Sequence, residues 1–252
     1  MEITFLGTGT SHGVPVITCK CSVCSSTNPK NKRTRSSVWV LLDDVSLLID
    51  TATEFRLQAL QAQIEHVDGV LYTHCHADHV FGFDDLRVFS QIMNRSIPVY
   101  GNEPTITELR EVFGYVFRKT QKGGGKPQVE TITVDGSFKV KGIPITPIPV
   151  FHGALPILGY RIGNMAYVTD CSFIPEESMK LLTGLELLIL GVVRYEPHST
   201  HMHVEQALNL VEELGPRQTY FTHISHLLEH EQVNAALPSY VQLAYAGLRI
   251  QI

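Results

Sequence analysis

Leu71-Tyr-Thr-His74-Cys-His76-Ala-Asp78-His79-Val80 is the stretch that decides the fold. It places four residues able to bind metal within six positions. The segment before it, residues 67–72, is apolar and β-branched, as expected of a buried strand. The segment after it, residues 83–92, has apolar residues at helical spacing. The cluster is therefore predicted to lie on a loop between a strand and a helix, where a rigid scaffold directs side chains into a cleft.

The residue types in this loop are those that divalent metals bind. Neutral imidazole and carboxylate are ordinary ligands for Zn²⁺, Mn²⁺ and Fe²⁺. His74 and His76 alternate as at a strand end, so both can face one ion, while Asp78 and His79 follow the turn and can face a second. Two ions about 3.5–4 Å apart clamp the attacking and leaving oxygens of a phosphoryl group. A chance cluster of polar side chains is disfavoured, because so many ionisable groups in one short loop need a charge to face them.

Composition and charge limit the class of protein. A length of 252 residues with 44% hydrophobic residues suits a single two-layered α/β body over residues 1–252. The net charge of −5 and a longest basic run confined to residues 30–35 disfavour tight binding of extended nucleic acid. The start lacks a signal peptide, and apolar runs such as 187–193 are too short to span a bilayer. We therefore expect a cytoplasmic protein with no membrane partner.

Three of the five cysteines lie together in Cys19-Lys-Cys21-Ser-Val-Cys24. In a chain without a visible secretory signal this spacing indicates metal binding before disulfides. Three thiolates supply most of a tetrahedral zinc shell, and the fourth ligand must come from elsewhere. The alternative is a group of free, buried cysteines.

The opening strand runs into a turn-rich loop, Gly7-Thr-Gly9-Thr-Ser-His12-Gly13-Val-Pro15. The loop lacks the GxGxxG spacing and the Lys-Ser/Thr of a P-loop, so nucleotide binding is a poor interpretation. His12 either lines the cleft or is an ordinary surface histidine. Further along, the lysine- and glycine-rich segment 119–127 is predicted as a solvated loop or as a mobile, positive flap beside an anionic substrate.

Further strand-like segments end in residues that bind metals. His152 follows residues 143–150, Asp170 follows 165–168, and His223 follows a strand at 218–222. Each of the first two, taken alone, is equally compatible with a satisfied buried polar group.

A second histidine cluster lies in Tyr195-Glu-Pro-His198-Ser-Thr-His201-Met-His203. Imidazole titrates near neutral pH, so a histidine at such a place is suited to proton transfer. The sequence alone leaves His198, His201 and His203 as rivals, with His203 better interpreted as the start of a helix.

The HxHxDH run at His74–His79 is the signature of the metallo-β-lactamase superfamily, and the chain resembles its PhnP-like phosphodiesterase branch, which is related to tRNase Z. The resemblance covers nearly the whole chain. HxHxDH identifies the superfamily and not the reaction, because lactonases, glyoxalase II, sulfatases and nucleases share it. The more specific features are the cysteine triplet, His201 and the run Thr222-His223-Ile-Ser-His226.

The resemblance implies an α/β fold of the α+β type, the αββα sandwich, with two mixed sheets back to back and helices outside. It implies that two divalent ions (Mn²⁺ or Zn²⁺, or else Fe²⁺) bind to His74, His76, Asp78, His79, His152, Asp170 and His223. In this scheme Asp170 bridges the two ions, and His201 and Asp78 are the catalytic residues, with His201 as proton donor. It further implies one structural Zn²⁺ on Cys19, Cys21, Cys24 and His226.

The implied function is metal-dependent hydrolysis of a small phosphodiester, with a cyclic sugar phosphate favoured, to a phosphomonoester by a hydroxide that two metals activate. tRNase Z carries a tRNA-gripping arm between its third histidine and its bridging aspartate. Only residues 153–169 occupy that place here, enough for a tight hairpin. The alternatives are a lactone or thioester hydrolase, an RNA-processing nuclease, and a non-catalytic metal-binding module, which the complete ligand set disfavours. Exposed apolar strands make a homodimer plausible.

Overall fold

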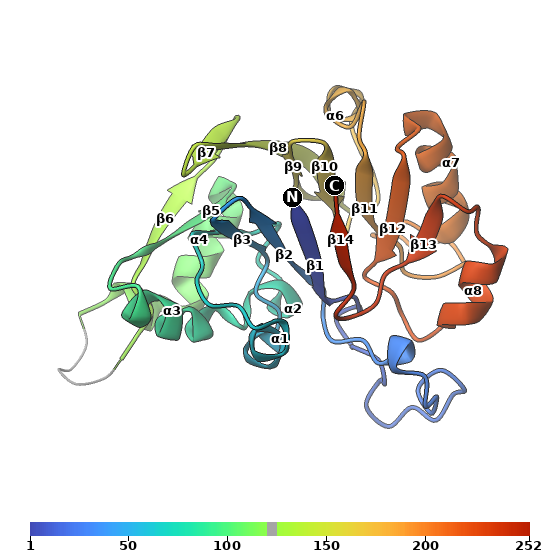
Figure 1. The fold of residues 1–252 in the computed structure, drawn as a ribbon, viewed down its shortest axis with the longest axis horizontal. Coiled ribbons are helices and arrows are strands. Elements are labelled where there is room, and N and C mark those ends of the chain that lie inside the picture. Colours follow the sequence, from blue (N-terminus) through green and yellow to red (C-terminus); the bar gives the residue numbers. More distant parts are fainter. Residues whose placement is uncertain (120–124) are drawn as a thin grey trace.

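Two sheets form the centre of the structure, a computed structural model that describes residues 1–119 and 125–252. Each sheet has seven strands within these residues, and helices cover the outer faces (Figure 1). This arrangement confirms the predicted αββα sandwich. Most of the glycine-rich segment predicted as a loop or flap falls on residues 120–124, outside the described residues, so that prediction stays a prediction.

The first sheet has the strand order β14-β1-β2-β3-β4-β5-β6. The bounds are β1 Glu2–Gly7, β2 Ser37–Leu42, β3 Val45–Ile49, β4 Gly69–Leu71, β5 Ile97–Gly101, β6 Val129–Thr133 and β14 Arg249–Gln251. Pairing is antiparallel from β14 to β3 and parallel from β3 to β6. The sheet is therefore mixed, as predicted.

The second sheet has the order β13-β12-β11-β10-β9-β8-β7. The bounds are β7 Phe138–Val140, β8 Ile143–His152, β9 Leu155–Ile162, β10 Met165–Val168, β11 Leu187–Gly191, β12 Gln218–Thr222 and β13 Val241–Leu243. Strands β10 to β13 pair in parallel, and β7 to β10 pair antiparallel. Strands β9 and β10 make the tight hairpin predicted for residues 153–169, which leaves no room there for an added arm.

The main helices lie outside the sheets. They are α1 Phe55–Ala62, α2 Ala77–Val80, α3 Leu86–Ile92, α4 Glu103–Val112, α5 Gly114–Phe117, α6 Glu176–Leu181, α7 Val204–Leu214 and α8 His230–Ala236. Helices α1 to α5 belong to the first sheet's half of the structure and α6 to α8 to the second sheet's half (Figure 1). In the part of the chain that the structure describes, no helix is long and apolar enough to cross a bilayer.

Strand β3 shows why the sequence produces layers. Its side chains alternate between two buried environments, because successive residues of a strand point to opposite faces. Leu47 and Ile49 pack between the two sheets, whereas Leu48 packs beneath the helices. A strand covered on both faces reads as a continuous apolar run, as Val45–Ile49 does.

The metal loop differs from its prediction. Residues 77–80, expected to be a loop, form the short helix α2. The amides of His79 and Val80 donate to the carbonyl oxygen of His76 at 2.9 and 3.2 Å, which closes the turn. This turn directs Asp78 and His79 into the protein, and both side chains are buried.

Among the described residues, large exposed apolar side chains lie on helices and loops, and none lies on a strand. Leu60, Val88 and Ile92 of α1 and α3 are 50–72% exposed. The prediction of a homodimer rested on exposed apolar strands, whereas the exposed apolar surface lies on helices α1 and α3. Dimerisation stays a prediction.

Asp68 is a buried carboxylate with three kinds of partner. It accepts hydrogen bonds from the Ser46 amide at 3.0 Å, from Lys141 at 2.7 Å and from Arg95. Burial alone would raise the pKa of Asp68, but the hydrogen bonds and charges of Lys141, Ser46 and Arg95 outweigh it and lower the pKa. The ionised form is therefore the one that stabilises the fold.

We expect Asp68→Asn to lower the free energy of unfolding by about 1–3 kcal/mol at pH 7, because the ionic hydrogen bonds are lost. A carboxyl with a lowered folded-state pKa stabilises above its unfolded pKa, about 3.9, and loses this contribution as pH falls through the folded-state value. Urea unfolding at pH 7 and in acid measures both effects, with exposed Asp135→Asn as control. A difference between wild type and variant that grows in acid would contradict this account.

Candidate metal centres

The predicted active-site ligands lie at strand ends along one edge of the sandwich. His74 and His76 follow β4, and His152 is the last residue of β8. Asp170 follows β10, and His223 follows β12. Loops at such an edge are free to carry polar side chains while the strands hold them in place.

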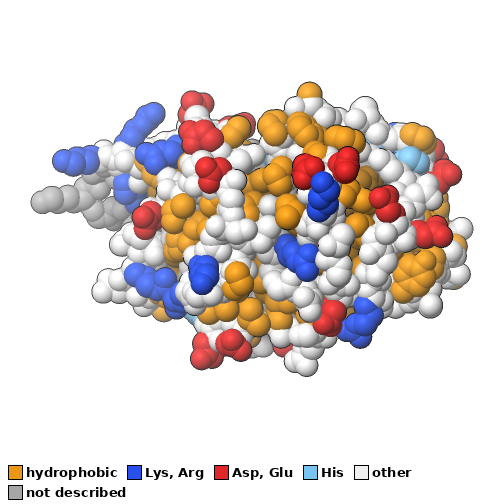
Figure 2. All heavy atoms as spheres, turned by 90° about the horizontal axis from the view of Figure 1, so that it is seen from above, with side chains coloured by type: hydrophobic (Ala, Val, Ile, Leu, Met, Phe, Trp, Pro, Cys, Tyr) orange, Lys and Arg blue, Asp and Glu red, His pale blue; other side chains and the backbone are white. Residues whose placement is uncertain are grey.

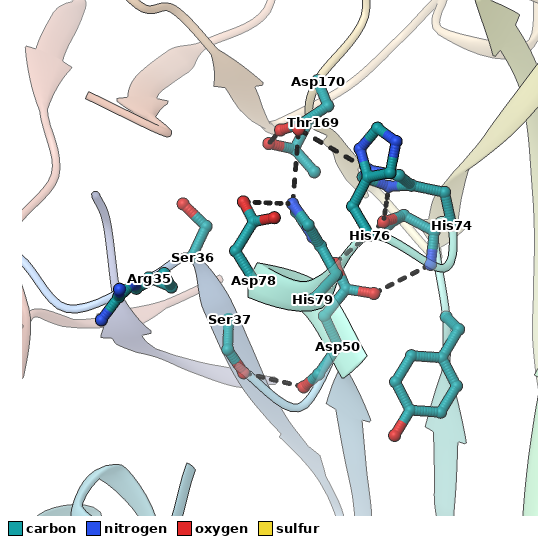
Figure 3. Close-up of polar contacts among 12 residues, drawn as sticks. Arg35, Ser36, Ser37, Asp50, His74, His76, Asp78, His79, Thr169 and Asp170 are labelled. Atoms are coloured by element: carbon teal, nitrogen blue, oxygen red, sulfur yellow. Dashed lines mark hydrogen bonds and ion pairs between the residues drawn. The ribbon is translucent and has the colours of Figure 1, made fainter. Parts of the chain in front are cut away.

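Asp170 is the centre of the cluster. One carboxylate oxygen lies 3.3 Å from His79 Nε2 and 3.7 Å from His74 Nε2, and the other lies 3.1 Å from His223 Nε2. In Figure 3 Asp170 faces the side chains of Asp78, His79, His74 and His76. A carboxylate with two oxygens facing different imidazoles is suited to bridge two cations.

Three groups of side chains around Asp170 are close enough to bind a metal. Their ligand atoms lie within 4.8 Å of one another in the sets Asp78–His79–Asp170–His223, His74–His76–Asp170 and His152–Asp170–His201. The ring of His152 lies 5.2 Å from that of His76 and 5.7 Å from that of His74. The structure thus brings all seven predicted ligands together and places His201 beside them.

His79 tests whether these residues fit a metal. Its Nδ1 donates to Asp50 at 2.7 Å. Its buried Nε2 has no hydrogen-bond partner among the described residues and lies 3.3 Å from both Asp78 and Asp170. Burial lowers the pKa of His79, but Asp170, Asp78 and Asp50 raise it well above its usual value. The negative charge that attracts a proton to Nε2 would equally attract a divalent cation, so the residues fit.

Asp50 is a functional residue that the sequence analysis missed. It is fully buried and accepts hydrogen bonds from His79, from the Thr73 amide at 2.8 Å and from the Thr73 hydroxyl at 2.9 Å. Figure 3 shows His79 lying between Asp50 and the pair Asp78 and Asp170. A carboxylate behind a ligating histidine fixes the ring and its tautomer. The sequence feature that could have identified Asp50 is its position directly after the strand 45–49, because Asp170 was identified from a similar position at a strand end.

His152 is held in a similar way. Its Nδ1 donates to the carbonyl oxygen of Thr200 at 2.8 Å, so its Nε2 is free to face the cluster. The bond also ties β8 to the segment that carries His201.

His201 is the member of the second histidine cluster that reaches the site. Its ring lies 4.6 Å from that of His152 and 5.1 Å from that of His223. Burial lowers the pKa of His201 to about 3, although Asp170 raises it. The ring of His198 lies 4.9 Å from that of His201, and among the described residues His198 belongs to none of the candidate ligand sets. His203 precedes α7 directly, as expected of a helix-start residue.

A cleft of about 210 Å³ opens beside His201 and His223. His12 lines it, so the interpretation as a cleft residue is the one the structure supports. Gly9 lets this wall lie against the neighbouring segment, because a Cβ there would be 2.7 Å from the Arg33 carbonyl oxygen. The turn-rich opening loop therefore forms one wall of the cleft.

The cysteine triplet meets His226, more than 200 positions away. The distances from His226 Nδ1 to the sulfurs of Cys19, Cys21 and Cys24 are 3.4, 3.4 and 3.6 Å. A tetrahedral ion with Zn–S near 2.3 Å and Zn–N near 2.0 Å requires about 3.5 Å between such ligand atoms, so the four residues fit Zn²⁺. Hydrogen bonds from the Cys24 amide and from His226 lower the pKa of Cys21 to about 6, which favours the thiolate that a metal binds.

Buried Arg33 supports the same loop from the other side. Its guanidinium donates to the carbonyl oxygens of Ser225 and Leu228, both at 2.8 Å. Because His223 and His226 lie on this loop, Arg33 and the cysteine cluster together hold one of the active-site ligands in place.

We expect Cys21→Ala to reduce the metal content by one ion per chain and to lower Tm by roughly 5–10 °C, because a structural zinc contributes folding energy. Elemental analysis and thermal unfolding measure both, with exposed Ser22→Ala on the same loop as control. An unchanged metal count would show that these cysteines bind no ion.

Comparison with known proteins agrees with this geometry. Residues 46–224 match a sequence profile described as a beta-lactamase superfamily domain. A solved structure described as a new diphosphatase from the PhnP family is 43% identical, with a TM-score of 0.93, and the match covers 100% of this chain and 97% of that one. The short form of human tRNase Z has a TM-score of 0.72 at 20% identity over 100% and 99% of the two chains, which shows a shared fold.

One curated relative is a longer protein. An octanoyltransferase of Porphyromonas gingivalis is 38% identical over 98% of this chain, but the match covers 51% of that protein. This chain therefore spans about half the length of that relative.

Proposed function

Because this chain belongs to the metallo-β-lactamase superfamily and to its PhnP family, we propose that it hydrolyses a phosphodiester bond in a small molecule. The favoured substrate is a cyclic sugar phosphate, and the product is a phosphomonoester. The observation that carries the proposal is the position of His201, which lies beside the Asp170-centred ligands and lines the cleft next to them.

Two divalent ions, Mn²⁺, Zn²⁺ or Fe²⁺, would neutralise the phosphate oxygens and lower the pKa of water from 15.7 to about 7. His74, His76 and His152 would hold one ion, Asp78, His79 and His223 the other, with Asp170 between them. The structural Zn²⁺ proposed for the cysteine cluster would take no part in the chemistry.

The protein's own residues orient this site. Asp50 fixes the ring of His79, and the Thr200 carbonyl fixes that of His152. Low exposure of Asp78, Asp170 and His223 excludes bulk water from the ligand side of the cluster. These contacts hold the ligands in place before substrate arrives.

His201 would give a proton to the leaving alkoxide. Burial lowers the pKa of its imidazole, so the charge that lets it carry a proton must come from the substrate. A bound phosphate diester brings negative charge beside the ring and so favours the protonated form. Proton donation by His201 is thereby linked to the presence of an anionic substrate.

The charge of the whole chain and the short connection between His152 and Asp170 bear on the substrate class. The net charge of −5 disfavours binding of extended nucleic acid. So does the hairpin of β9 and β10, because it fills residues 155–168, the place where tRNase Z carries its tRNA-gripping arm. Figure 2 shows the edge that carries the chain ends, on the other side of the molecule from α2 and the metal loop, and there Lys and Arg side chains lie among Asp and Glu. A small phosphodiester fits these features better than RNA. We also expect the protein in the cytoplasm.

A second candidate is hydrolysis of a diphosphate linkage, because the 43% identical structure is described as a diphosphatase. Thioester or lactone hydrolysis is a weaker candidate. The name octanoyltransferase belongs to a protein of which this chain covers 51%, so the named activity can reside in the other half.

The test combines metal analysis with a substrate panel in the presence of Mn²⁺. The panel contains bis(p-nitrophenyl) phosphate, a cyclic ribose phosphate, a dialkyl diphosphate, a lactone and an octanoyl thioester. The proposal predicts about three ions per chain, two in the active site and one on the cysteines, and fastest cleavage of the cyclic sugar phosphate. Turnover of the lactone or thioester without cleavage of any phosphate would overturn it.

A further inference from the structure

The Asp170 carboxylate has one polar neighbour that is not a predicted metal ligand. Among the described residues, its polar contacts are with His74, His79, His223 and Thr169. The Thr169 hydroxyl donates to Oδ1 at 3.0 Å, and Figure 3 shows the two side chains next to each other. A histidine nitrogen that binds metal has no proton to donate to a carboxylate. Thr169 is therefore the residue that can orient Asp170 by a hydrogen bond when the ions are bound.

The two oxygens of Asp170 have different surroundings. Oδ2 lies 3.7 Å from His74 Nε2 and 3.3 Å from His79 Nε2, so it faces one ligand of each proposed ion. Oδ1 lies 3.1 Å from His223 Nε2 and accepts the Thr169 hydroxyl. Rotation about the last side-chain bond of an aspartate is soft and would exchange the two oxygens. The bond from Thr169 determines which oxygen both sets of ligands meet.

The contact lies where water cannot replace it. Thr169 is fully buried, and Asp170 is 3% exposed. Asp170 also has a left-handed backbone conformation, with φ at 56°, which a residue other than glycine keeps only when its surroundings hold it. A carboxylate that loses its hydrogen bond at this place has no solvent donor to take over.

The neighbouring strand leaves room for the Thr169 hydroxyl. Gly191 is the last residue of β11, which pairs with β10. A Cβ at this position would lie 3.0 Å from Thr169 Oγ1 and 2.9 Å from the amide nitrogen of Asp170. Glycine therefore lets β11 approach the end of β10 while the hydroxyl stays where it reaches the carboxylate.

We infer that Thr169 is a positioning residue for the paired ions, and that its hydroxyl holds the Asp170 carboxylate so that Oδ2 is presented to both sets of ligands. The inference rests on the two-ion arrangement of the proposed function and does not depend on the substrate. Groups that hold a metal ligand in place typically change metal affinity 10–100-fold when they are removed. The alternative is that the hydroxyl only satisfies the protein interior, in which case its removal would change stability and leave metal binding unaltered.

The experiment compares Thr169→Val, which keeps the shape and removes the hydroxyl, with Thr169→Ser, which keeps the hydroxyl. Mn²⁺ is titrated into protein stripped of its active-site ions, and EPR spectroscopy measures both free Mn²⁺ and the magnetic coupling between bound ions. We expect Thr169→Val to weaken Mn²⁺ binding roughly 10–100-fold and to lose the coupled signal. Thr169→Ser should stay within about 3-fold of the wild type and keep that signal.

Thr219→Val is the matched control, because Thr219 is also fully buried in this sheet and its hydroxyl has no partner among the described residues. It should bind Mn²⁺ as the wild type does. Thermal unfolding of the metal-free proteins checks that each variant is folded. If Thr169→Val does not fold, Thr169→Ala replaces it, since alanine also lacks the hydroxyl and places no branched side chain in the interior.

Wild-type affinity and coupling in the folded variant without the hydroxyl would overturn the inference, and so would an equal loss in Thr219→Val. A wild-type protein that binds fewer than two active-site ions would overturn both this inference and the proposed function. Loss of coupling in Thr169→Val, together with two ions but no phosphodiester cleavage in the wild type, would support the inference while overturning the proposed function.

Discussion

Replacing Asp170 with alanine is expected to lower the active-site metal content and to reduce kcat/KM roughly 10³-fold or more, because bound metals contribute several kcal/mol of transition-state stabilisation. Asp170 belongs to all three sets of candidate ligands around the active site. Its removal therefore weakens the binding of both proposed ions at once. It leaves His74 without a facing carboxylate, and the Nε2 atoms of His79 and His223 with Asp78 alone.

Elemental analysis distinguishes this effect from general unfolding. The zinc proposed for the cysteine cluster should remain, so the metal count should fall toward one and not to zero. The exposed Asp135→Ala variant is the control, and it should keep all ions and full activity. An Asp170→Ala variant that retains the wild-type metal count would refute the central role given to this carboxylate.

The second large effect is expected for His201→Ala. This change should lower kcat roughly 10²–10⁴-fold on a cyclic sugar phosphate, because the leaving alkoxide loses its proton donor. The loss should be much smaller on bis(p-nitrophenyl) phosphate, since nitrophenolate leaves well without a proton. Rates on both substrates, together with the metal content, measure this prediction.

His203→Ala is the matched control, because His203 precedes α7 and belongs to none of the candidate ligand sets among the described residues. Equal losses on the two leaving groups would contradict proton donation by His201. A loss of metal in the His201→Ala variant would instead make His201 a ligand, which its closeness to Asp170 and His152 would then explain.

The strand ends are the part of the site that sequence patterns predicted well. Alternation and β-branched runs located β8, β10 and β12 to within a few residues, so His152, Asp170 and His223 were recognisable as loop residues at strand ends. These strand ends lie along one edge because of the topology of the two mixed sheets. The family resemblance predicted that topology, whereas hydrophobic periodicity does not reveal the order of strands in a sheet.

Contacts between distant segments were beyond sequence reasoning alone. The pairing of the cysteine triplet with His226 came from the resemblance, because nothing in the spacing of the cysteines indicates a partner about 200 positions away. Asp50 was missed since a lone aspartate after a strand is common, and its role depends on a 2.7 Å contact with His79, 29 positions on. The role of Arg33 likewise depends on a carbonyl oxygen, that of Ser225, which lies 192 positions further along the chain.

The two ends of the chain meet in the first sheet. Strand β1 lies between β2 and β14, and the amino group of Met1 donates to the carbonyl oxygen of Ile252 at 2.9 Å. During synthesis on the ribosome, β1 therefore emerges long before its neighbour β14 and has one unpaired edge until the last strand is made. Such edges invite pairing with other chains. A nascent chain halted before residue 249 should consequently depend on chaperones. The ion proposed for the cysteine–histidine cluster can be held by all four ligands only after residue 226 has emerged, more than 200 residues after Cys24.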